Sequence, residues 1–224
     1  RLFRSVRAVS LVGLAVTPGL RRYLTDRLGV EHVFERGGTN EGAALDECHL
    51  HTGMHVHEDS CYLEVVDDDG RPCAEGETGR LVVTKLVPGG SPFIRYDTGD
   101  RAAFQPGSCP CGIAFRRLRM LGRPESTVVV DGRPITAFEV RRLLDERADL
   151  VGRISLLVHD PERPDLLRVA IEGDPVGACP RAELAVALGL APAQVQLDWL
   201  RGTEVAWGFR QVVDVNDPVT GERR

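Results

Sequence analysis

The apolar positions near the start of the chain form short runs that predict a strand, a helix and a second strand. Residues 8–16 form a short apolar run, which is typical of a strand buried on both faces. The pair Thr17-Pro18 then supplies an N-cap and a first helical residue, and an apolar stripe over residues 18–28 predicts a helix that Gly29 ends. Residues 30–34 form the second strand, so the segment predicts a βαβ-type unit.

The middle of the chain has the alternating pattern of half-buried strands. Residues 55–66 alternate and predict a strand pair, followed by a hairpin turn at 67–70. Another strand is expected at 80–86. Residues 101–104 and 114–121 predict a hairpin that a Cys-Pro-Cys-Gly turn connects. This part of the chain therefore predicts a small, twisted β subdomain.

The pattern changes after a linker at residues 122–126. Thr136 and Glu139 have the spacing of a capping box, which starts a helix at 137–147. The remaining elements are expected as strands at 127–130, 153–159, 166–172 and 195–200 and a helix at 180–189. Their β-α-β-β-α-β order predicts a small α+β domain of ferredoxin-like type. We therefore expect residues 1–122 and 126–224 to form separate domains, with a hinge at 123–125.

Composition and charge narrow the classes of function. The chain has 224 residues and a net charge of −5, which gives no reason to expect nucleic acid or an anionic membrane as a partner. No run of 18 apolar residues occurs, so no membrane-spanning helix is expected. The six cysteines are too irregularly spaced for a disulfide scaffold, which favours reduced thiols and a cytoplasmic protein. Lys85 is the only lysine among 28 lysine and arginine residues.

Three cysteines and a group of histidines could bind a metal. The turn Cys109-Pro110-Cys111-Gly112 offers two thiolates, and Cys48 offers a third at the start of a segment with four histidines. A Cys₃His set is typical of a closed, structural zinc site. The fourth ligand could be His51, from its Cys-x-x-His spacing, or His55. The alternative is that these groups are reduced thiols and exposed imidazoles.

Two glycine-containing segments could bind a nucleotide. Residues 92–100 join an apolar run to a Thr-Gly-Asp sequence, and a carboxylate such as that of Asp100 can accept hydrogen bonds from both hydroxyls of a ribose. The alternative is an aspartate that caps the backbone of a turn. Residues 36–42 form a glycine-rich segment after a strand, which can bring backbone amides close to a ligand or be a plain polar turn.

An ordered series of motifs resembles one enzyme family. The series consists of residues 47–59 (ECHLHTGMHVHED), 64–67 (EVVD), 79–84 (GRLVVT), 94–100 (IRYDTGD), 109–112 (CPCG) and 121–123 (LGR). Together they resemble the phenylacetate-CoA ligase and coenzyme F390 synthetase branch of the adenylate-forming enzymes. The resemblance extends from about residue 8 to about residue 145 and covers only the C-terminal half of such an enzyme. It implies an α/β and α+β fold, with the end of a large domain followed by a small one.

The resemblance also implies roles for individual residues. Gly38, Thr39 and Asn40 occupy the segment that serves the nucleotide phosphates and magnesium in the family. Asp100 would bind the ribose hydroxyls of ATP or AMP, and Arg123 would contact the same nucleotide. Two further implications concern His55, which becomes the favoured fourth metal ligand, and Glu125, which occupies the place of the hinge between the domains.

The sequence departs from the family pattern at catalytic positions. Arg36 replaces a tyrosine, and Asn40 replaces the glutamate of the nucleotide segment. The family's phosphate-binding loop, rich in Ser, Thr and Gly and ending in Pro-Lys, does not occur in the 224 residues. Arg210 is the only cation where the catalytic lysine is expected, and Lys85 lies in the β subdomain, where we expect it to be no substitute.

The resemblance implies two alternative functions. The first is an adenylate-forming ligase that uses ATP, Mg²⁺ and a small carboxylic acid, and transfers the acyl group to CoA or a carrier-protein thiol. Such an enzyme would need a complementary N-terminal half, and Zn²⁺ would be structural. The second is a non-catalytic relative that binds a nucleotide or acts as a scaffold.

Overall fold

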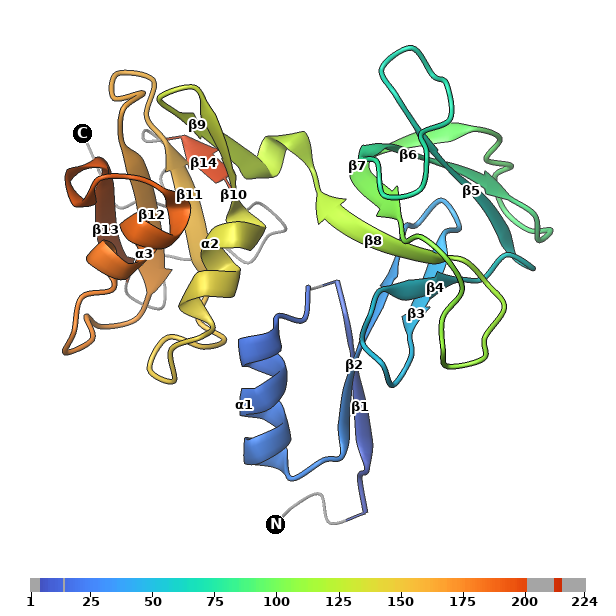
Figure 1. Cartoon of the computed structure of the whole chain (residues 1–224), viewed down its shortest axis with the longest axis horizontal. Coiled ribbons are helices and arrows are strands. Elements are labelled where there is room, and N and C mark those ends of the chain that lie inside the picture. Colours follow the sequence, from blue (N-terminus) through green and yellow to red (C-terminus); the bar gives the residue numbers. More distant parts are fainter. Residues whose placement is uncertain (1–4, 14, 201–211, 215–224) are drawn as a thin grey trace. The chain divides into compact units, whose positions relative to one another are not determined.

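A computed structural model describes residues 5–13, 15–200 and 212–214 of the chain (Figure 1). The chain divides into two compact units. The first unit comprises residues up to Val16 and Leu24–Pro124, and the second comprises Thr17–Tyr23 and the residues from Glu125 onward. The main chain therefore leaves the first unit for the last time after Pro124.

An eight-stranded mixed sheet forms the first unit. Its strands are β1 (Ala8–Val12), β2 (His32–Gly38), β3 (Ala44–Glu47), β4 (Met54–Val56), β5 (Cys61–Val66), β6 (Gly79–Lys85), β7 (Tyr96–Phe104) and β8 (Arg117–Gly122). Their order in the sheet is β1-β2-β3-β4-β8-β7-β6-β5. The sheet therefore ends at β1 on one side and at β5 on the other.

The predicted βαβ-type unit is confirmed. Strands β1 and β2 pair in parallel, and helix α1 (Pro18–Leu28) lies between them in the sequence. The Thr17 hydroxyl caps the helix by accepting a hydrogen bond from the backbone N–H of Leu20 at 3.1 Å. Strand β1 ends at Val12 and not at residue 16, because Gly13 adopts a left-handed φ of 75° that an extended strand cannot contain.

The antiparallel part of the sheet differs from the prediction at residues 55–66. These residues form β4 and β5, but the two strands do not pair with each other: β4 pairs with β3 and β8, and β5 pairs with β6. The physical reason is that β3 and β8 occupy both edges of β4, so β4 has no free edge with which β5 could pair. One apolar core, with Leu45, Leu63 and Leu81 near its centre, joins strands β3 to β8.

The Thr-Gly-Asp sequence does not reverse the chain. It lies inside β7, where the pairing with β6 shifts register between Arg80 and Val82. Gly99, with φ of 77°, provides the left-handed residue that this irregularity needs. Strands β7 and β8 then form the predicted hairpin around the Cys-Pro-Cys-Gly turn.

Between Pro124 and Asp214, the described residues form two sheets and the helices α2 and α3. The elements are β9 (Thr127–Val130), β10 (Arg133–Thr136), α2 (Ala137–Leu144), β11 (Ser155–His159), β12 (Leu167–Glu172), α3 (Arg181–Leu188), β13 (Val195–Leu200) and β14 (Val212–Asp214), with short 3₁₀ turns at Pro124–Ser126 and Pro192–Gln194. Strands β9 and β10 form a hairpin of their own. The other four strands form a sheet in the order β13-β12-β11-β14.

This topology departs from the predicted β-α-β-β-α-β order. The strand before α2 was expected in the main sheet, but β9 pairs with β10, which the sequence analysis did not identify as a strand. Both residues of the intervening turn have positive φ, 48° at Asp131 and 77° at Gly132, which is the geometry of a two-residue hairpin turn. The fourth strand of the main sheet is therefore β14, which pairs in parallel with β11.

Helices α2 and α3 cover one face of the four-stranded sheet. Val140 of α2 and Leu184 of α3 belong to the same apolar core as Leu157 and Val169 of the sheet. The capping box predicted at the start of α2 is confirmed, since the Thr136 hydroxyl accepts from the Glu139 backbone and the Glu139 carboxylate accepts from the Thr136 backbone. No described helix combines the length and apolar character needed to cross a bilayer.

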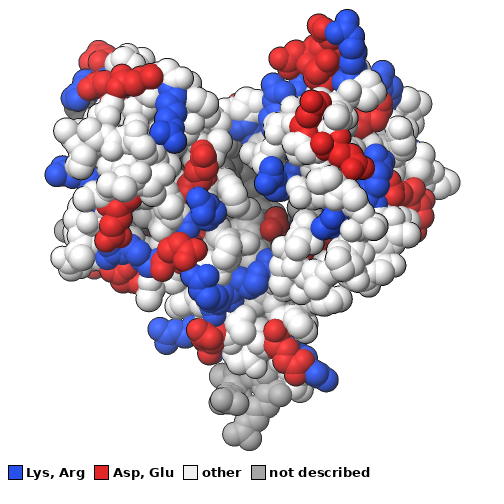
Figure 2. Space-filling view, viewed as in Figure 1, with Lys and Arg blue, Asp and Glu red and all other residues white. Residues whose placement is uncertain are grey.

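Acidic and basic side chains are interspersed over the face of the molecule in Figure 2. Many of them are paired on the surface, as in the Arg7–Glu31 and Arg71–Asp69 ion pairs at 2.6 Å. Exposed pairs of this kind contribute little to stability. The fold is therefore held mainly by its apolar cores.

Candidate functional site

The predicted metal ligands come from two segments of the first unit. Cys48 follows directly after β3, and His55 lies in the middle of β4. Cys109 and Cys111 lie in the turn between β7 and β8, where the Cys109 carbonyl accepts a hydrogen bond from the Gly112 N–H at 3.2 Å. Because β4 pairs directly with β8, the sheet brings the two segments side by side.

The four side chains converge on one point. Their ligand atoms, three Sγ atoms and a ring nitrogen, all lie within 4.8 Å of one another. The Sγ atoms of Cys48 and Cys109 are 3.8 Å apart, and the Cys111 Sγ is 3.3 Å from Nε2 of His55. Two ligands about 2.3 Å from a tetrahedral zinc ion would lie about 3.8 Å apart. The donor set and its spacing therefore fit a tetrahedral metal ion.

His55 is held in the orientation of a ligand. Its ring is buried, and its Nδ1 lies 3.0 Å from the carbonyl oxygen of Phe115. A proton on Nδ1 donates to this carbonyl and leaves the lone pair of Nε2 facing the thiols, as metal-bound histidines usually require.

Two other histidines of the segment contact carboxylates instead. Nδ1 of His51 lies 3.0 Å from the Glu47 carboxylate, and Nε2 of His57 lies 2.8 Å from that of Asp46. The structure therefore selects His55 over His51 as the fourth member of the cluster.

The cluster shifts the pKa values of two thiols in opposite directions. The backbone N–H of Cys111 is the main cause that lowers the pKa of Cys109 to about 6, and hydrogen bonds from Cys111, His55 and Cys48 act in the same direction. Burial raises the pKa of the Cys48 thiol. Of these two thiols, Cys109 therefore ionises at the lower pH.

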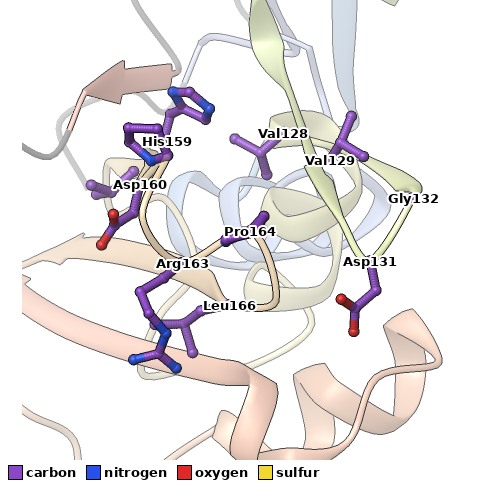
Figure 3. A pocket seen from close by; sticks show the side chains of 11 residues that line it. Val128, Val129, Asp131, Gly132, His159, Asp160, Arg163, Pro164 and Leu166 are labelled. Carbon is purple, nitrogen blue, oxygen red and sulfur yellow. The ribbon is translucent and has the colours of Figure 1, made fainter.

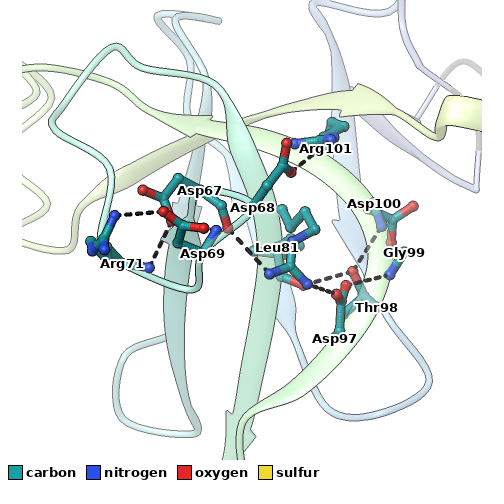
Figure 4. A network of polar contacts seen from close by, with 11 residues as sticks. Asp67, Asp68, Asp69, Arg71, Leu81, Asp97, Thr98, Gly99, Asp100 and Arg101 are labelled. Carbon is teal, nitrogen blue, oxygen red and sulfur yellow. Dashed lines mark hydrogen bonds and ion pairs between the residues drawn. The ribbon is translucent and has the colours of Figure 1, made fainter.

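The predicted ribose ligand lies on the irregular part of β7 (Figure 4). The Thr98 hydroxyl accepts from the Asp100 N–H at 3.1 Å and donates to the Leu81 carbonyl at 3.1 Å. The Asp97 carboxylate accepts from the Gly99 N–H at 3.0 Å. These bonds fix the backbone that leads into Asp100.

The structure brings Asp100 and Arg123 together. Nε of Arg123 donates to the Asp100 carboxylate at 2.9 Å. The Asp100 side chain is only 12% exposed, whereas that of Arg123 is 58% exposed. The two residues that were predicted to contact one nucleotide thus lie side by side although 23 positions separate them in the sequence.

The glycine-rich segment forms a tight connection between β2 and β3. The Thr39 N–H donates to the Ala43 carbonyl, and the Gly42 N–H donates to the Thr39 carbonyl, both at 3.1 Å. Gly38 has φ of 154°, and a Cβ atom there would lie 2.4 Å from the Ala43 carbonyl oxygen. The Thr39 hydroxyl is buried without a hydrogen-bond partner among the described residues, and Asn40 is exposed.

Arg210, the predicted catalytic cation, lies outside the described residues. Arg36, at the family's tyrosine position, places its Nε 3.3 Å from the Asp46 carboxylate, which also contacts His57. The Arg36 and Asp46 positions pair across β2 and β3, so this contact follows from a strand register that the sequence alone did not define.

The second unit has a pocket that the sequence analysis did not identify (Figure 3). It has a volume of about 380 Å³. Its lining combines apolar residues with polar ones, among which are Asp131, His159, Asp160 and Arg163. These residues come from the β9–β10 turn and from the β11–β12 connection, and the β9–β10 pairing was not predicted.

Comparisons with known proteins agree with the motifs. No family model matches the chain. The chain is 28% identical over 162 residues to the phenylacetate-coenzyme A ligase of Escherichia coli (strain K12), a match that covers 70% of this chain and 36% of that protein. The resemblance to the phenylacetate-CoA ligase branch is confirmed. The chain spans only about a third of the length of this curated relative.

Solved structures support the same fold. A 2-hydroxyisobutyryl-CoA ligase in the postadenylation state, in complex with R3-HIB-AMP, matches with a TM-score of 0.75 and 22% identity over 96% of this chain and 50% of that one. The anthranilate CoA ligase AuaEII in complex with anthranoyl-AMP matches with a TM-score of 0.57 and 15% identity over 87% of this chain and 40% of that one. The chain thus has the fold of part of each of these two ligases.

Proposed function

We propose that the chain is part of an adenylate-forming ligase. It would bind ATP, help to activate a small carboxylic acid as an acyl-adenylate, and take part in transfer of the acyl group to CoA or a carrier-protein thiol. The similarity to phenylacetate-coenzyme A ligase and the fold shared with CoA ligases support this class of reaction. The contribution of this chain would be to hold the nucleotide.

The observation that carries the proposal is the pair formed by Asp100 and Arg123. A carboxylate fixed at the strand irregularity can accept hydrogen bonds from two ribose hydroxyls, and the guanidinium of Arg123 beside it would place a positive charge next to the same nucleotide. The backbone around Asp100 is already held by Thr98 and Asp97, so little conformational entropy would be lost on binding.

Thr39 and Asn40 extend the proposed nucleotide site toward the phosphates. The buried Thr39 hydroxyl is a donor in need of an acceptor, which a phosphate oxygen would supply. Asn40 offers a neutral amide oxygen where the family has a carboxylate, so it is a weaker ligand for Mg²⁺. We therefore expect Mg²⁺ to arrive with ATP and to be held mainly by the phosphates.

Three parts of the proposal extend beyond the nucleotide. A complementary segment or partner would supply the phosphate-binding loop that the 224 residues do not contain. Residues 123–125 would act as the hinge that lets the second domain change position between the two half-reactions. Arg210 would be the cation that takes the place of the catalytic lysine, with the geometry and hydration of a guanidinium.

We also propose that Cys48, His55, Cys109 and Cys111 bind one structural Zn²⁺ ion. All four positions would be filled by the protein, so the ion would have no open position for a substrate and would instead tie the β7–β8 turn to β4. Its contribution would be to the stability of the first unit.

Calorimetric titration with AMP tests the nucleotide site. Asp100→Asn should weaken AMP binding by roughly 2–4 kcal/mol, because it removes the charge from two hydrogen bonds. Asp68→Asn is the matched control, since it makes the same charge change on a side chain that is 85% exposed. Equal AMP affinity of wild type and Asp100→Asn would refute the site. A wild-type protein that binds no AMP would instead favour the non-catalytic scaffold.

A further inference from the structure

The only lysine of the chain lies at the end of β6, close to the glycine-rich connection. The Lys85 backbone N–H donates to the Phe93 carbonyl at 2.9 Å, which fixes the position of its Cα. A Cβ atom added to Gly42 would lie 3.1 Å from Cγ and 3.3 Å from Cδ of Lys85. The aliphatic part of Lys85 therefore lies over Gly42, at the end of the segment that begins with Gly38.

The Lys85 ammonium has no carboxylate partner among the described residues. Its Nζ donates one hydrogen bond, to the Gly89 carbonyl at 2.7 Å. An ammonium has three N–H donors, so two remain for other acceptors. Most other cations of the first unit are already paired, as Arg80 is with Asp97 and Arg95 is with Glu64.

The glycine-rich connection next to Lys85 contains a further hydrogen-bond donor, the Thr39 hydroxyl. The Gly42 N–H is bonded to the Thr39 carbonyl, so Lys85 and Thr39 belong to the same small region. The Thr39 hydroxyl is buried and has no described partner. An uncompensated ammonium and an unused hydroxyl beside a glycine-rich connection favour an anion and disfavour a metal cation.

We propose that Lys85 binds a phosphate group of the nucleotide, together with Thr39. This inference rests on the proposed nucleotide-binding function and adds a residue to it. The lysine side chain has a flexible four-carbon stem, so the Lys85 ammonium would exchange the Gly89 carbonyl for a phosphate oxygen. It would supply positive charge for the phosphate from the β subdomain.

A comparison of AMP with adenosine tests this role, because only AMP carries the phosphate. Lys85→Met keeps the aliphatic packing on Gly42 and removes the charge. We expect calorimetry to show AMP affinity lowered by about 10- to 100-fold, the usual effect of one charge-assisted hydrogen bond. Adenosine affinity should change less than about twofold, and Lys85→Arg should recover part of the AMP affinity.

Arg7→Gln is the control, since it removes one positive charge from a side chain that is 77% exposed and lies next to β1, far from β6 in the strand order. It should leave the affinity for AMP unchanged. If Lys85→Met leaves AMP affinity unchanged while Asp100→Asn lowers it, the role of Lys85 is wrong and the nucleotide site stands. If wild type binds neither AMP nor adenosine, the proposed function itself fails.

Discussion

The first unit contains two candidate sites that differ in how complete they are. The cysteine–histidine cluster is closed, because its four ligand atoms lie within 4.8 Å of one another and its imidazole is oriented by the Phe115 carbonyl. The nucleotide region is open in the sense that its polar groups are not joined to one another. The Thr39 hydroxyl has no described hydrogen-bond partner, and Asn40 is exposed to solvent. Groups that share one small ion must meet each other, whereas groups that contact a large ligand need only surround it.

The largest effect that we expect is a loss of stability when the cysteine–histidine cluster loses its metal. We expect purified protein to contain about one equivalent of zinc, and Cys109→Ser to lower the free energy of unfolding by several kcal/mol, because metal affinity contributes directly to folding. Elemental analysis and denaturant unfolding measure the two quantities. Cys179→Ser is the control, since Cys179 is an exposed thiol outside the cluster.

Substitution of single histidines tests which of them binds the metal. His55→Gln should release zinc, whereas His51→Gln should retain it, because only His55 faces the thiols. A metal-free protein that unfolds at the same denaturant concentration as the metal-loaded one would contradict the structural role of the cluster.

The nucleotide region should not catalyse adenylation unless residues from outside this chain complete it. We expect the 224-residue chain alone to be inactive in carboxylic acid-dependent pyrophosphate exchange. The phosphate-binding loop is not in its sequence, and the loss of one charge-stabilising group already costs about 10²–10³ in rate. A robust exchange signal from this chain alone would show that the chemistry lies on other residues.

Position 40 offers a finer test once a complementary segment restores exchange. Asn40→Glu should then raise the rate if the site is a weakened version of the family's, and the uncharged Asn40→Gln should not. If both variants are neutral or harmful, the chain has adapted this region to a different reaction.

The smallest expected effect is a pH dependence of the metal-free cluster. Folding lowers the pKa of Cys109 from an ordinary value of 9.0 to about 6, so this thiol stabilises the fold most above its unfolded pKa, and the contribution disappears as the pH falls toward 6. Cys48, whose pKa is raised by burial, opposes this at alkaline pH. Iodoacetamide should modify Cys109 with a midpoint near pH 6 and zinc should suppress the reaction; a midpoint near 9 would contradict the shift.

The sequence predicted local features better than strand partners. The helix at Pro18–Leu28 and the capping box at Thr136 depend on neighbouring residues, and both are confirmed. The pairing of β4 with β8 depends on residues about 60 positions apart, and the β9–β10 hairpin depends on a left-handed conformation at Asp131. Strand order is decided by tertiary packing, which a local pattern does not contain.

The cysteine–histidine cluster could be predicted from the sequence, whereas the position of Lys85 could not. Thiolate chemistry limits what three cysteines and a histidine can do together, so the cluster followed from residue types and motif order, although spacing alone left His51 as an alternative. Lysine chemistry is less restrictive. The contact of Lys85 with Gly42 depends on how the end of β6 approaches the β2–β3 connection, and no motif marks it.

The separation of the cluster's two halves along the chain has a consequence for biosynthesis. Cys48 and Cys109 are 61 residues apart. At a translation rate of about 5–20 residues per second, the second half leaves the ribosome about 3–12 seconds after the first. During this interval Cys48 and His55 have no partners from the later turn, so a bound ion would be held by few ligands. Stable capture of the metal would therefore mark the moment at which the nascent sheet acquires its last hairpin.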